Sequence, residues 1–546
     1  MSTDALPIRR RCWQPGDFFA FGWTRSLLLV LLAMAVSVLL FGFFYPYWRK
    51  ADQDLVLAYD AMLFNQGLPQ ENFDHTGYLS FLLLAVWYAF LHAIRLLPIH
   101  TLAELPPARD VAAFDVAWQH LVAAGRVFSL LVAGGFVVVF STLIRRLVGE
   151  WRIALLAAVA LAFSGGIALH TRMIRTELLS ASLTGTALLL VLVAGEENLR
   201  RRRSVLLALA ALAATLAVTT KVQAIIIALA LPVVALPFGR LSERGETMRV
   251  SRADMGWIAA WGLAAVAAGI PAATLYLHGF DPNLTPLYRY PRLGLLPEGA
   301  YQALFALWVF GGMLIYARLW RVRADDTISA MLAVFAGVSL GILALTLRYN
   351  DQNLIAFTHP VEHLYFFASW HTTSLASTSQ ILSPTLVVES IKGVLLTIVA
   401  HLNLFNRPTV LVEWFAIGGL VVSLRRGDWS LFYRVGILIA VVWAIEVVFS
   451  LRYLNNNYFP YTDPLLITAA ALVATRFPQL WATPRARPYL AIAVAIYWLL
   501  GSLGSIALAF DRRGPEGACE WLPDYLKRVE SFPFCSVPTA AKKAPG

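Results

Sequence analysis

The feature that most constrains this chain is a series of apolar stretches, most of them about 18 residues or longer, separated by short breaks rich in arginine. An apolar helix of about 20 residues crosses a hydrocarbon core about 30 Å thick at 1.5 Å per residue. Composition agrees: 59% of the residues are hydrophobic and 14% are charged, against about 45–50% and about 25% in soluble domains. The sequence therefore predicts an all-α polytopic membrane protein and excludes a soluble enzyme, a disordered chain and a single-anchor protein.

The net charge of +11 indicates orientation rather than a nucleic-acid partner, because the arginines cluster in the hydrophilic breaks, as at Arg145-Arg146 and Arg200 to Arg203. Such clusters mark cytoplasmic loops. With these loops inside, about thirteen spans are predicted, with the N-terminus in the cytoplasm and the C-terminus outside. The spans fall near residues 26–45, 127–144, 153–169, 178–193, 204–217, 222–237, 257–277, 304–316, 328–347, 410–424, 431–450, 464–475 and 489–510. A cleavable signal peptide is not expected, because the first apolar run is too long.

Two apolar stretches do not fit this alternation. If residues 78–97 crossed the membrane, every later basic loop would change sides. This stretch is interrupted by His92 and Arg95 and ends in Pro98, which favours an interfacial helix. The alternative is a true span combined with a miscount elsewhere. Residues 393–400 are too short to cross and are also expected to stay at the outer face.

This topology divides the chain into four parts. Residues 1–25 are the cytoplasmic N-terminus, and residues 26–240 form a membrane module that includes an external loop over residues 48–126. Residues 241–510 hold the remaining spans, with external loops at residues 279–299, 348–408 and 452–463, and residues 511–546 are an external tail. Cys519 and Cys535 stand alone in that tail and are candidates for a disulfide in an oxidising compartment. Cytoplasmic connections are short, so any chemistry is expected on the external face.

Ionisable residues gather at three predicted external edges, over residues 51–78, 170–177 and 219–223. Burying a charge at the membrane centre costs roughly 2.5–3.5 kcal/mol. A carboxylate beside an apolar surface gains basicity, and neighbouring cations attract anions. The pattern favours a transfer reaction in which a carboxylate takes a proton from a hydroxyl and cations neutralise a departing phosphate. The alternative is that the cations snorkel to the surface and the carboxylates cap helices.

An ordered set of motifs carries a family resemblance. The set comprises the Asp-containing segment at residues 51–55, Met62-Leu63, Gly67, Phe73 with Gly77-Tyr78, Arg126, residues 172–177, Thr220-Lys221, Arg452-Tyr453-Leu454, Pro460 and Pro464. This order resembles the GT-C superfamily of glycosyltransferases, on the branch of the lipid A aminoarabinose transferases and protein O-mannosyltransferases. The resemblance covers residues 1–240 well and the remainder in outline.

The resemblance implies a GT-C-like bundle and an inverting transfer of a sugar from a polyprenyl-phosphate carrier to an acceptor hydroxyl. The acceptor would be a glycolipid, a glycan or a protein at the periplasmic face of a bacterial inner membrane, in cell-envelope assembly. In this resemblance Asp52 is the catalytic base, with Asp54 as the alternative. Glu177 would contact the acceptor or a divalent ion such as Mg or Mn. The residues expected to bind the donor phosphate are His75, Arg172, Arg175 and Lys221. His75 departs from the branch, which has a lysine there. Metal dependence stays open, since members of the superfamily differ in it.

The later external loops offer further candidates. His359, Glu362 and His363 lie in the loop over residues 348–408, and Arg452 and Tyr453 lie in the next one. They are possible substrate contacts, although aromatic-rich loops also form interfacial belts. The histidines of the first loop could hold a metal, but loop histidines are more often unligated. The competing function is a transporter or flippase of a lipid-linked sugar, which internal repeats would favour and which no visible repeat supports.

Overall fold

The computed structural model describes residues 21–72, 77–197, 200–239, 252–287, 299–369, 384–404, 407–450, 457–478, 486–509, 519, 522–529 and 532–535. Over these residues the chain forms helices and no strand. In the first half they are α1 (Phe21–Leu40), η2 (Tyr47–Lys50), α2 (Ala51–Asn65), α3 (Tyr78–Ala93), η3 (Leu102–Glu104), α4 (Val111–Val148), α5 (Trp151–Ala162), α6 (Gly165–His170), α7 (Thr176–Glu196), α8 (Arg200–Thr220), α9 (Ala224–Ala235), η4 (Leu236–Phe238) and α10 (Arg252–His278). In the second half they are η5 (Pro282–Leu287), α11 (Ala300–Leu319), α12 (Ala324–Leu343), η6 (Ala344–Arg348), α13 (Asp351–Thr358), α14 (Pro360–Ser369), α15 (Pro384–Ala400), α16 (Thr409–Arg426), α17 (Trp429–Ser450), α18 (Phe459–Ala474), α20 (Ala486–Ala509), α21 (Leu522–Tyr525) and η9 (Pro533–Cys535).

Eight helices in the described part of the chain are long and apolar enough to cross a membrane: α1, α4, α7, α8, α10, α11, α12 and α17. Shorter apolar helices include α3, α5, α9 and α18. Each predicted span coincides with a helix, but the span predicted over residues 153–169 is divided into α5 and α6, because Ser164 caps α6 by accepting a hydrogen bond from the Ile167 amide. The total of about thirteen crossings remains a prediction.

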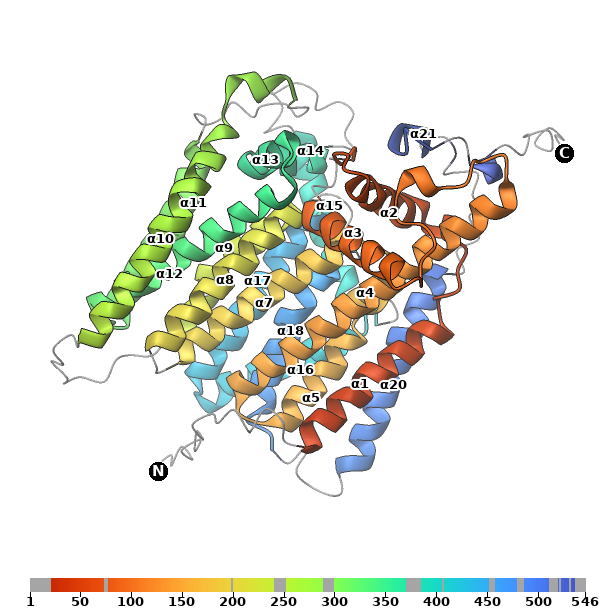
Figure 1. Cartoon of the computed structure of the whole chain (residues 1–546). Coiled ribbons are helices and arrows are strands. Elements are labelled where there is room, and N and C mark those ends of the chain that lie inside the picture. Colours follow the sequence, from red (N-terminus) through yellow and green to blue (C-terminus); the bar gives the residue numbers. More distant parts are fainter. Residues whose placement is uncertain are drawn as a thin grey trace.

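The long helices form one bundle with α10, α11 and α12 on one side and α1 with α20 on the other (Figure 1). The hydroxyls of Ser37 on α1 and Ser502 on α20 are 2.8 Å apart, which ties the first helix to the last long one. The bundle core is built mainly from aliphatic side chains of α4, α5, α7, α17 and α18. Such helices carry exposed apolar residues on their outer faces, including Leu29, Leu263 and Leu307.

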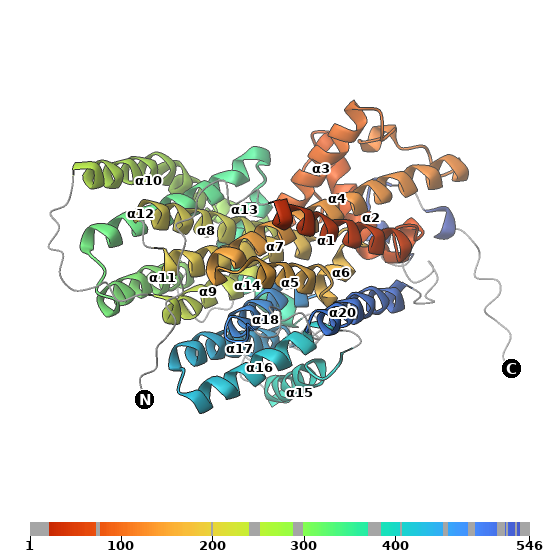
Figure 2. The same cartoon turned by 90° about the horizontal axis from the view of Figure 1, so that it is seen from below.

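The segment predicted as an external loop over residues 48–126 is largely helical. The helix α4 begins at Val111, where Asp110 caps it by accepting from the Ala113 amide, and it continues without interruption into the predicted span. The helix α3 runs across the direction of the bundle helices (Figure 1) and projects beside α4 (Figure 2). Tyr78, Phe81 and Tyr88 bury one face of α3. Its opposite face exposes Val86 and Phe90, as expected of an interfacial helix.

A second hydrophobic cluster is formed by side chains of α2, α3 and the start of α4, together with side chains of the C-terminal tail. The ring of Phe532 lies 5.5 Å from those of both Phe114 and Trp118. Arg528 Nε donates to Glu71 Oε1 at 2.7 Å, and Cys519 is joined to Cys535 by a disulfide. The tail therefore packs on the segment between the first two long helices.

The helix α15 includes the stretch that was predicted to be too short to cross. Gly393 packs against Ser450 at the end of α17, and His401 just beyond α15 reaches Glu446 one turn earlier in α17. The end of α15 therefore packs against the end of α17, while Leu395 and Val399 on its other side are exposed.

Candidate functional site

The three edges predicted from the sequence, at residues 51–78, 170–177 and 219–223, contact one another in pairs. The Ile174 amide donates to Asp54 Oδ1 at 2.8 Å, which joins the first edge to the second. Lys221 Nζ lies 3.2 Å from Glu177 Oε1, which joins the second to the third. The Gly77 amide donates to the Thr220 carbonyl at 2.9 Å, which joins the first to the third. Segments far apart in the sequence thus form one junction at the end of the bundle where α2 and α3 lie.

Asp54 connects several segments of this junction through hydrogen bonds and an ion pair. Its Oδ2 accepts from Arg126 Nε at 3.2 Å and Nη2 at 2.7 Å, and both side chains are fully buried. Arg126 Nη1 also donates to the carbonyls of Phe43 and Tyr45. A carboxylate held by a guanidinium and a backbone amide is poorly placed to accept a proton from substrate. Asp54 therefore joins α2, α4 and the α6–α7 turn, and its alternative assignment as base remains a prediction.

Arg172 caps the end of α1. Its Nε donates to the Phe41 carbonyl at 3.0 Å, and its Nη2 donates to the carbonyl and hydroxyl of Ser37 at 3.2 and 2.7 Å. Its Nη1 bonds the Ala168 carbonyl. These groups satisfy the last carbonyls of α1, whose helix dipole also favours a cation there. Arg172 is 4% exposed, and its predicted contact with donor phosphate remains a prediction.

The charged centre consists of Arg175, Glu177 and Lys221. Glu177 lies in the first turn of α7, where the helix dipole favours a carboxylate. Its Oε1 lies 3.2 Å from Lys221 Nζ and its Oε2 lies 3.4 Å from Arg175 Nε. Lys221 is 1% exposed because α8 ends at Thr220 and α9 begins at Ala224, leaving no room for a loop that would carry it to solvent. The three side chains together carry one positive charge, which attracts an anion to this buried position.

Further polar groups surround the centre. His170 Nδ1 donates to the Gly166 carbonyl at 2.7 Å, and its buried Nε2 has no hydrogen-bond partner among the described residues. Burial first, and then the charge of Arg175, lower the pKa of His170 to about 4, so the imidazole is neutral near pH 7. Within the same described part, both ends of the buried Gln223 amide also have no partner. Unsatisfied buried polar atoms of this kind indicate a position that a ligand or water completes.

The start of α18 closes one side of this junction. A Cβ added at Gly166 would lie 2.5 Å from the Pro460 nitrogen, so glycine is required for the contact between α6 and α18. Tyr461, in the first turn of α18, is buried. The prolines singled out from the sequence therefore lie at the helix end that packs on the charged centre.

Glu177 is a poor metal ligand in this arrangement. Both of its oxygens face cationic groups, and Oε2 also accepts from the Thr176 hydroxyl at 3.2 Å. A divalent ion would have to displace both cations. The geometry instead gives Glu177 the role of orienting Arg175 and Lys221.

The side chains of the remaining candidate site residues lie either outside the described part of the chain or at the end of α13 and in α14. Asp52 lies in the first turn of α2, and its side chain is outside the described part. His75, Arg452 and Tyr453 also lie outside the described residues. His359 ends α13, where its Nδ1 lies 2.9 Å from the Thr358 hydroxyl and its ring packs near Phe280. Glu362 and His363 are buried in α14. Among the residues that the structure describes, these side chains do not form a metal-binding group.

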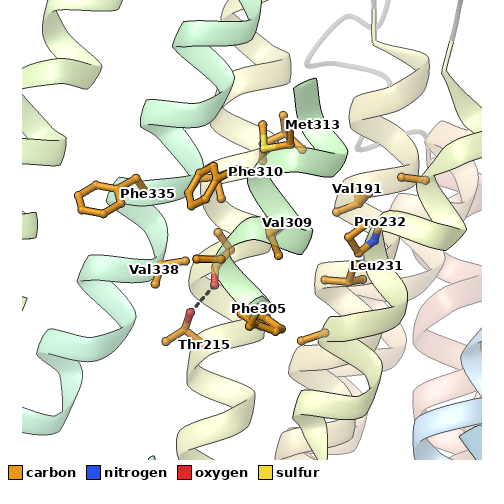
Figure 3. Close-up of a pocket in the computed structure, with 18 of the residues that line it drawn as sticks. Val191, Thr215, Leu231, Pro232, Phe305, Val309, Phe310, Met313, Phe335 and Val338 are labelled. Carbon is orange, nitrogen blue, oxygen red and sulfur yellow. Dashed lines mark hydrogen bonds between the residues drawn. The ribbon is translucent and has the colours of Figure 1, made fainter. Parts of the chain in front are cut away.

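An apolar cavity of about 750 Å³ is lined mainly by residues of α7, α8, α9, α11 and α12 (Figure 3). Figure 3 shows Leu231, Phe305, Val309, Phe310 and Val338 lining it, with the Thr215 hydroxyl bonded to a backbone carbonyl. At one end it reaches Arg203 and Asp326. At the other it includes Val218 and Ile225, which flank Lys221 within about one helical turn. The lining therefore runs along α8 from Arg203 to Val218, which lies three residues before Lys221.

A buried ionic network, which sequence reasoning missed, joins α15–α18. Arg407 donates to both oxygens of Glu446 at 2.9 and 2.6 Å, and its Nη2 lies 3.2 Å from Asp463 Oδ1. His401 Nε2 lies 3.0 Å from Glu446 and its Nδ1 lies 2.5 Å from Glu413. The available signal was the presence of Glu413 and Glu446 inside predicted spans, since intramembrane carboxylates require partners.

Comparisons with known proteins give one structural likeness. No protein-family model matches the sequence, and no curated protein matches it. The apo crystal structure of the oligosaccharyltransferase from Archaeoglobus fulgidus is similar with a TM-score of 0.42 and 12% identity, covering 96% of this chain. This chain spans 62% of the length of that protein. The function is therefore inferred from this chain's own residues.

Proposed function

We propose that this protein is a GT-C-type glycosyltransferase that moves a sugar from a polyprenyl-phosphate carrier to an acceptor hydroxyl at the external face of the membrane. One observation carries the proposal: an apolar cavity of about 750 Å³ is lined by Val218 and Ile225, which lie within about one helical turn of Lys221 along the chain, and Lys221 belongs to the buried centre with Arg175 and Glu177. A polyprenyl phosphate fits both features, because its long apolar chain suits the cavity and its anionic phosphate suits the charged centre.

In this proposal the isoprenoid chain occupies the cavity and its phosphate binds Arg175 and Lys221. Glu177 holds the two cations in place, so the leaving phosphate meets charge that is already oriented. The neutral His170 presents an unprotonated Nε2, because its Nδ1 donates to a carbonyl. Together with the Gln223 amide it offers hydrogen bonds to sugar hydroxyls.

The transfer step is an inverting displacement at the anomeric carbon. The acceptor oxygen forms a bond to that carbon while the bond from the carbon to the phosphate oxygen breaks, and its electrons remain on the departing polyprenyl phosphate. We assign Asp52 as the base that takes the hydroxyl proton. Its position is supported by Asp54, which anchors the same helical turn to the Ile174 amide beside Arg175.

The proposed setting is the periplasmic face of a bacterial inner membrane, with a glycolipid, glycan or protein as acceptor. The disulfide between Cys519 and Cys535 suits an oxidising compartment. The tail shares a face with the candidate site, because the Arg528 amide donates to the Tyr59 hydroxyl on α2 at 3.3 Å.

The test is transfer from a panel of radiolabelled polyprenyl-phosphate sugars by the full chain in lipid. We expect carrier-dependent transfer that Asp52→Asn abolishes and Lys221→Gln lowers at least tenfold, while the exposed Lys527→Gln leaves it unchanged. Normal turnover by Asp52→Asn would remove the base assignment. Absence of transfer with every donor would overturn the proposed function.

The second candidate function is a flippase for a lipid-linked sugar. The observation that favours it is the reach of the cavity from Arg203 and Asp326 at one end of the bundle to Tyr276 and Gln302 at the other. Movement of the intact donor between leaflets in vesicles, unaffected by Asp52→Asn, would support this function in place of transfer.

A further inference from the structure

A second cluster of metal-binding side chains lies away from the charged centre, where the chain leaves α3 and turns toward η3. It consists of His92, His100 and Glu104, and one ligand atom from each lies within 4.8 Å of those of the other two. The two imidazole rings are stacked with their centroids 4.0 Å apart. Among the described residues no other group of three histidine, cysteine or acidic side chains has this arrangement.

The backbone at the end of α3 creates this approach. The Leu96 amide bonds the Leu91 carbonyl and the Arg95 amide bonds the His92 carbonyl, both at 2.9 Å. These two bonds define a Schellman turn, in which the residue at Arg95 takes a left-handed conformation and is usually glycine. Arg95 has a φ of 62°, which costs an L-residue roughly 1 kcal/mol. The turn reverses the chain so that residues 97–104 return over His92.

Contacts with α2 and η3 fix the other half of the cluster. Asn65 Nδ2 donates to the carbonyls of His100 and Ala85, both at 3.1 Å. Glu104 Oε2 accepts from the amides of His100 at 2.7 Å and Thr101 at 3.2 Å, completing a capping box. The three side chains are therefore held before any ion binds.

Hydrogen bonds set the tautomer of His92 and indicate which nitrogen of His100 faces the site. His92 Nδ1 lies 3.1 Å from the Leu97 carbonyl, which only accepts, so Nδ1 carries the proton and Nε2 keeps a lone pair for an ion. Metal-binding histidines have this arrangement, in which the second nitrogen donates to a carbonyl. His100 Nδ1 lies 2.9 Å from Glu104 Oε2, so these two atoms are placed to bind one ion that displaces the proton between them to solvent.

We propose that His92, His100 and Glu104 bind a divalent transition-metal ion of the Zn²⁺ type, which joins the end of α3 to the turn that leads into α4. Imidazole nitrogens and a carboxylate are ligands that Zn²⁺ accepts at about 2.0–2.2 Å, whereas Mg²⁺ and Ca²⁺ favour oxygen ligands. His92 and His100 are partly exposed, so an ion can enter from solvent. Three protein ligands leave a fourth position for water.

The site would stabilise the external segment and is independent of sugar transfer. Its two halves belong to the end of α3 and to the connection before α4, and both pack on α2. An ion that bridges them restrains this connection. Binding to the folded form alone also raises the melting temperature as the metal concentration rises.

The experiment is a Co²⁺ titration of the full chain, purified without a polyhistidine tag and followed by visible absorption, with Zn²⁺ as competitor. His92→Asn is the central variant, because its amide can still donate to the Leu97 carbonyl but has no Nε2. The matched control is His120→Asn, which changes an exposed histidine on α4. We expect one Co²⁺ per chain, displaced by Zn²⁺, with affinity at least tenfold weaker in His92→Asn and unchanged in His120→Asn.

Equal Co²⁺ affinity in the wild type and His92→Asn, or no Co²⁺ spectrum in the wild type, would overturn the site. If His92→Asn does not fold, Glu104→Gln replaces it, because its amide oxygen can still accept from the two backbone amides while the charge is lost. This variant is expected to bind at least tenfold more weakly, and unchanged binding would again overturn the proposal. These readouts do not depend on whether the chain transfers sugar.

Discussion

At the scale of single residues, the buried pair of Asp54 and Arg126 holds α2 against α4. Asp54→Asn leaves the Arg126 guanidinium buried without its carboxylate, and breaking a buried ion pair in this way costs about 3–5 kcal/mol. We expect a clear fall in the melting temperature of the detergent-solubilised protein. Loss of transfer by this variant would then accompany loss of the fold, unlike the loss expected for Asp52→Asn.

The control is Glu197→Gln, which breaks the partly exposed pair with Arg146 at 3.3 Å. Partly exposed pairs contribute about 0–1 kcal/mol, so this variant should melt close to the wild type. A melting temperature for Asp54→Asn equal to that of Glu197→Gln would contradict the structural role given to Asp54.

Asp60 on α2 predicts a pH dependence of stability. Burial raises the pKa of this carboxyl from 3.8 to about 7, even though the Glu71 amide and the Asn72 side chain donate to it at 2.9 and 2.8 Å. The raised pKa means that its stabilising contribution is complete below pH 3.8 and is lost as pH rises through about 7. The difference is on the order of 4 kcal/mol at most.

We therefore expect the wild type to lose stability between about pH 4 and pH 7 relative to Asp60→Asn, which cannot ionise. The measurement is melting temperature against pH for both proteins. The variant also loses one accepted hydrogen bond, so only the slopes are compared. Parallel curves would show that Asp60 stays ionised in the folded protein.

At the scale of elements, the packing of α15 depends on a few buried charges. Arg407, between α15 and α16, binds Glu446 on α17 and Asp463 on α18. Arg407→Leu would leave two carboxylates buried without their cation, at a cost of about 3–5 kcal/mol. We expect a large fall in the melting temperature, with little change for the exposed Arg425→Leu on α16. Similar melting of the two variants would show that the network contributes little.

The sequence predicted the helices and placed the three edges on one face because both depend on patterns within short windows. Long apolar runs define spans, and edge residues lie where neighbouring helices begin or end. The particular partners could not be predicted in this way. Arg172 and Arg175 are three residues apart and look equivalent in sequence, yet one caps α1 and the other faces Glu177. Their roles depend on contacts with distant segments that no local pattern records.

At the scale of the whole molecule, the C-terminal tail joins the end of the chain to the segment between α1 and α4. The disulfide between Cys519 and Cys535 closes a loop with a sequence separation of 16 residues, and loops of this size are stabilised by about 3 kcal/mol. We expect dithiothreitol to lower the melting temperature of the wild type and to leave a Cys519→Ser, Cys535→Ser variant unchanged. An equal fall in the melting temperature of both proteins would show that the reductant does not act through this disulfide.

The apolar cavity predicts that transfer depends on the length of the isoprenoid chain of the donor. Val309 on α11 lines the cavity, whereas Leu307 on the same helix is 68% exposed and is not part of the lining. Val309→Trp fills space that a long isoprenoid chain needs, so transfer from a long-chain carrier should fall about tenfold, which corresponds to about 1.4 kcal/mol. Transfer from a carrier of two isoprene units, too short to reach Val309, should be unchanged. Leu307→Trp adds the same ring on the lipid side and should affect neither substrate. An equal loss for both carriers would mean that the cavity does not hold the donor chain, because only a chain-length-dependent loss identifies the occupant.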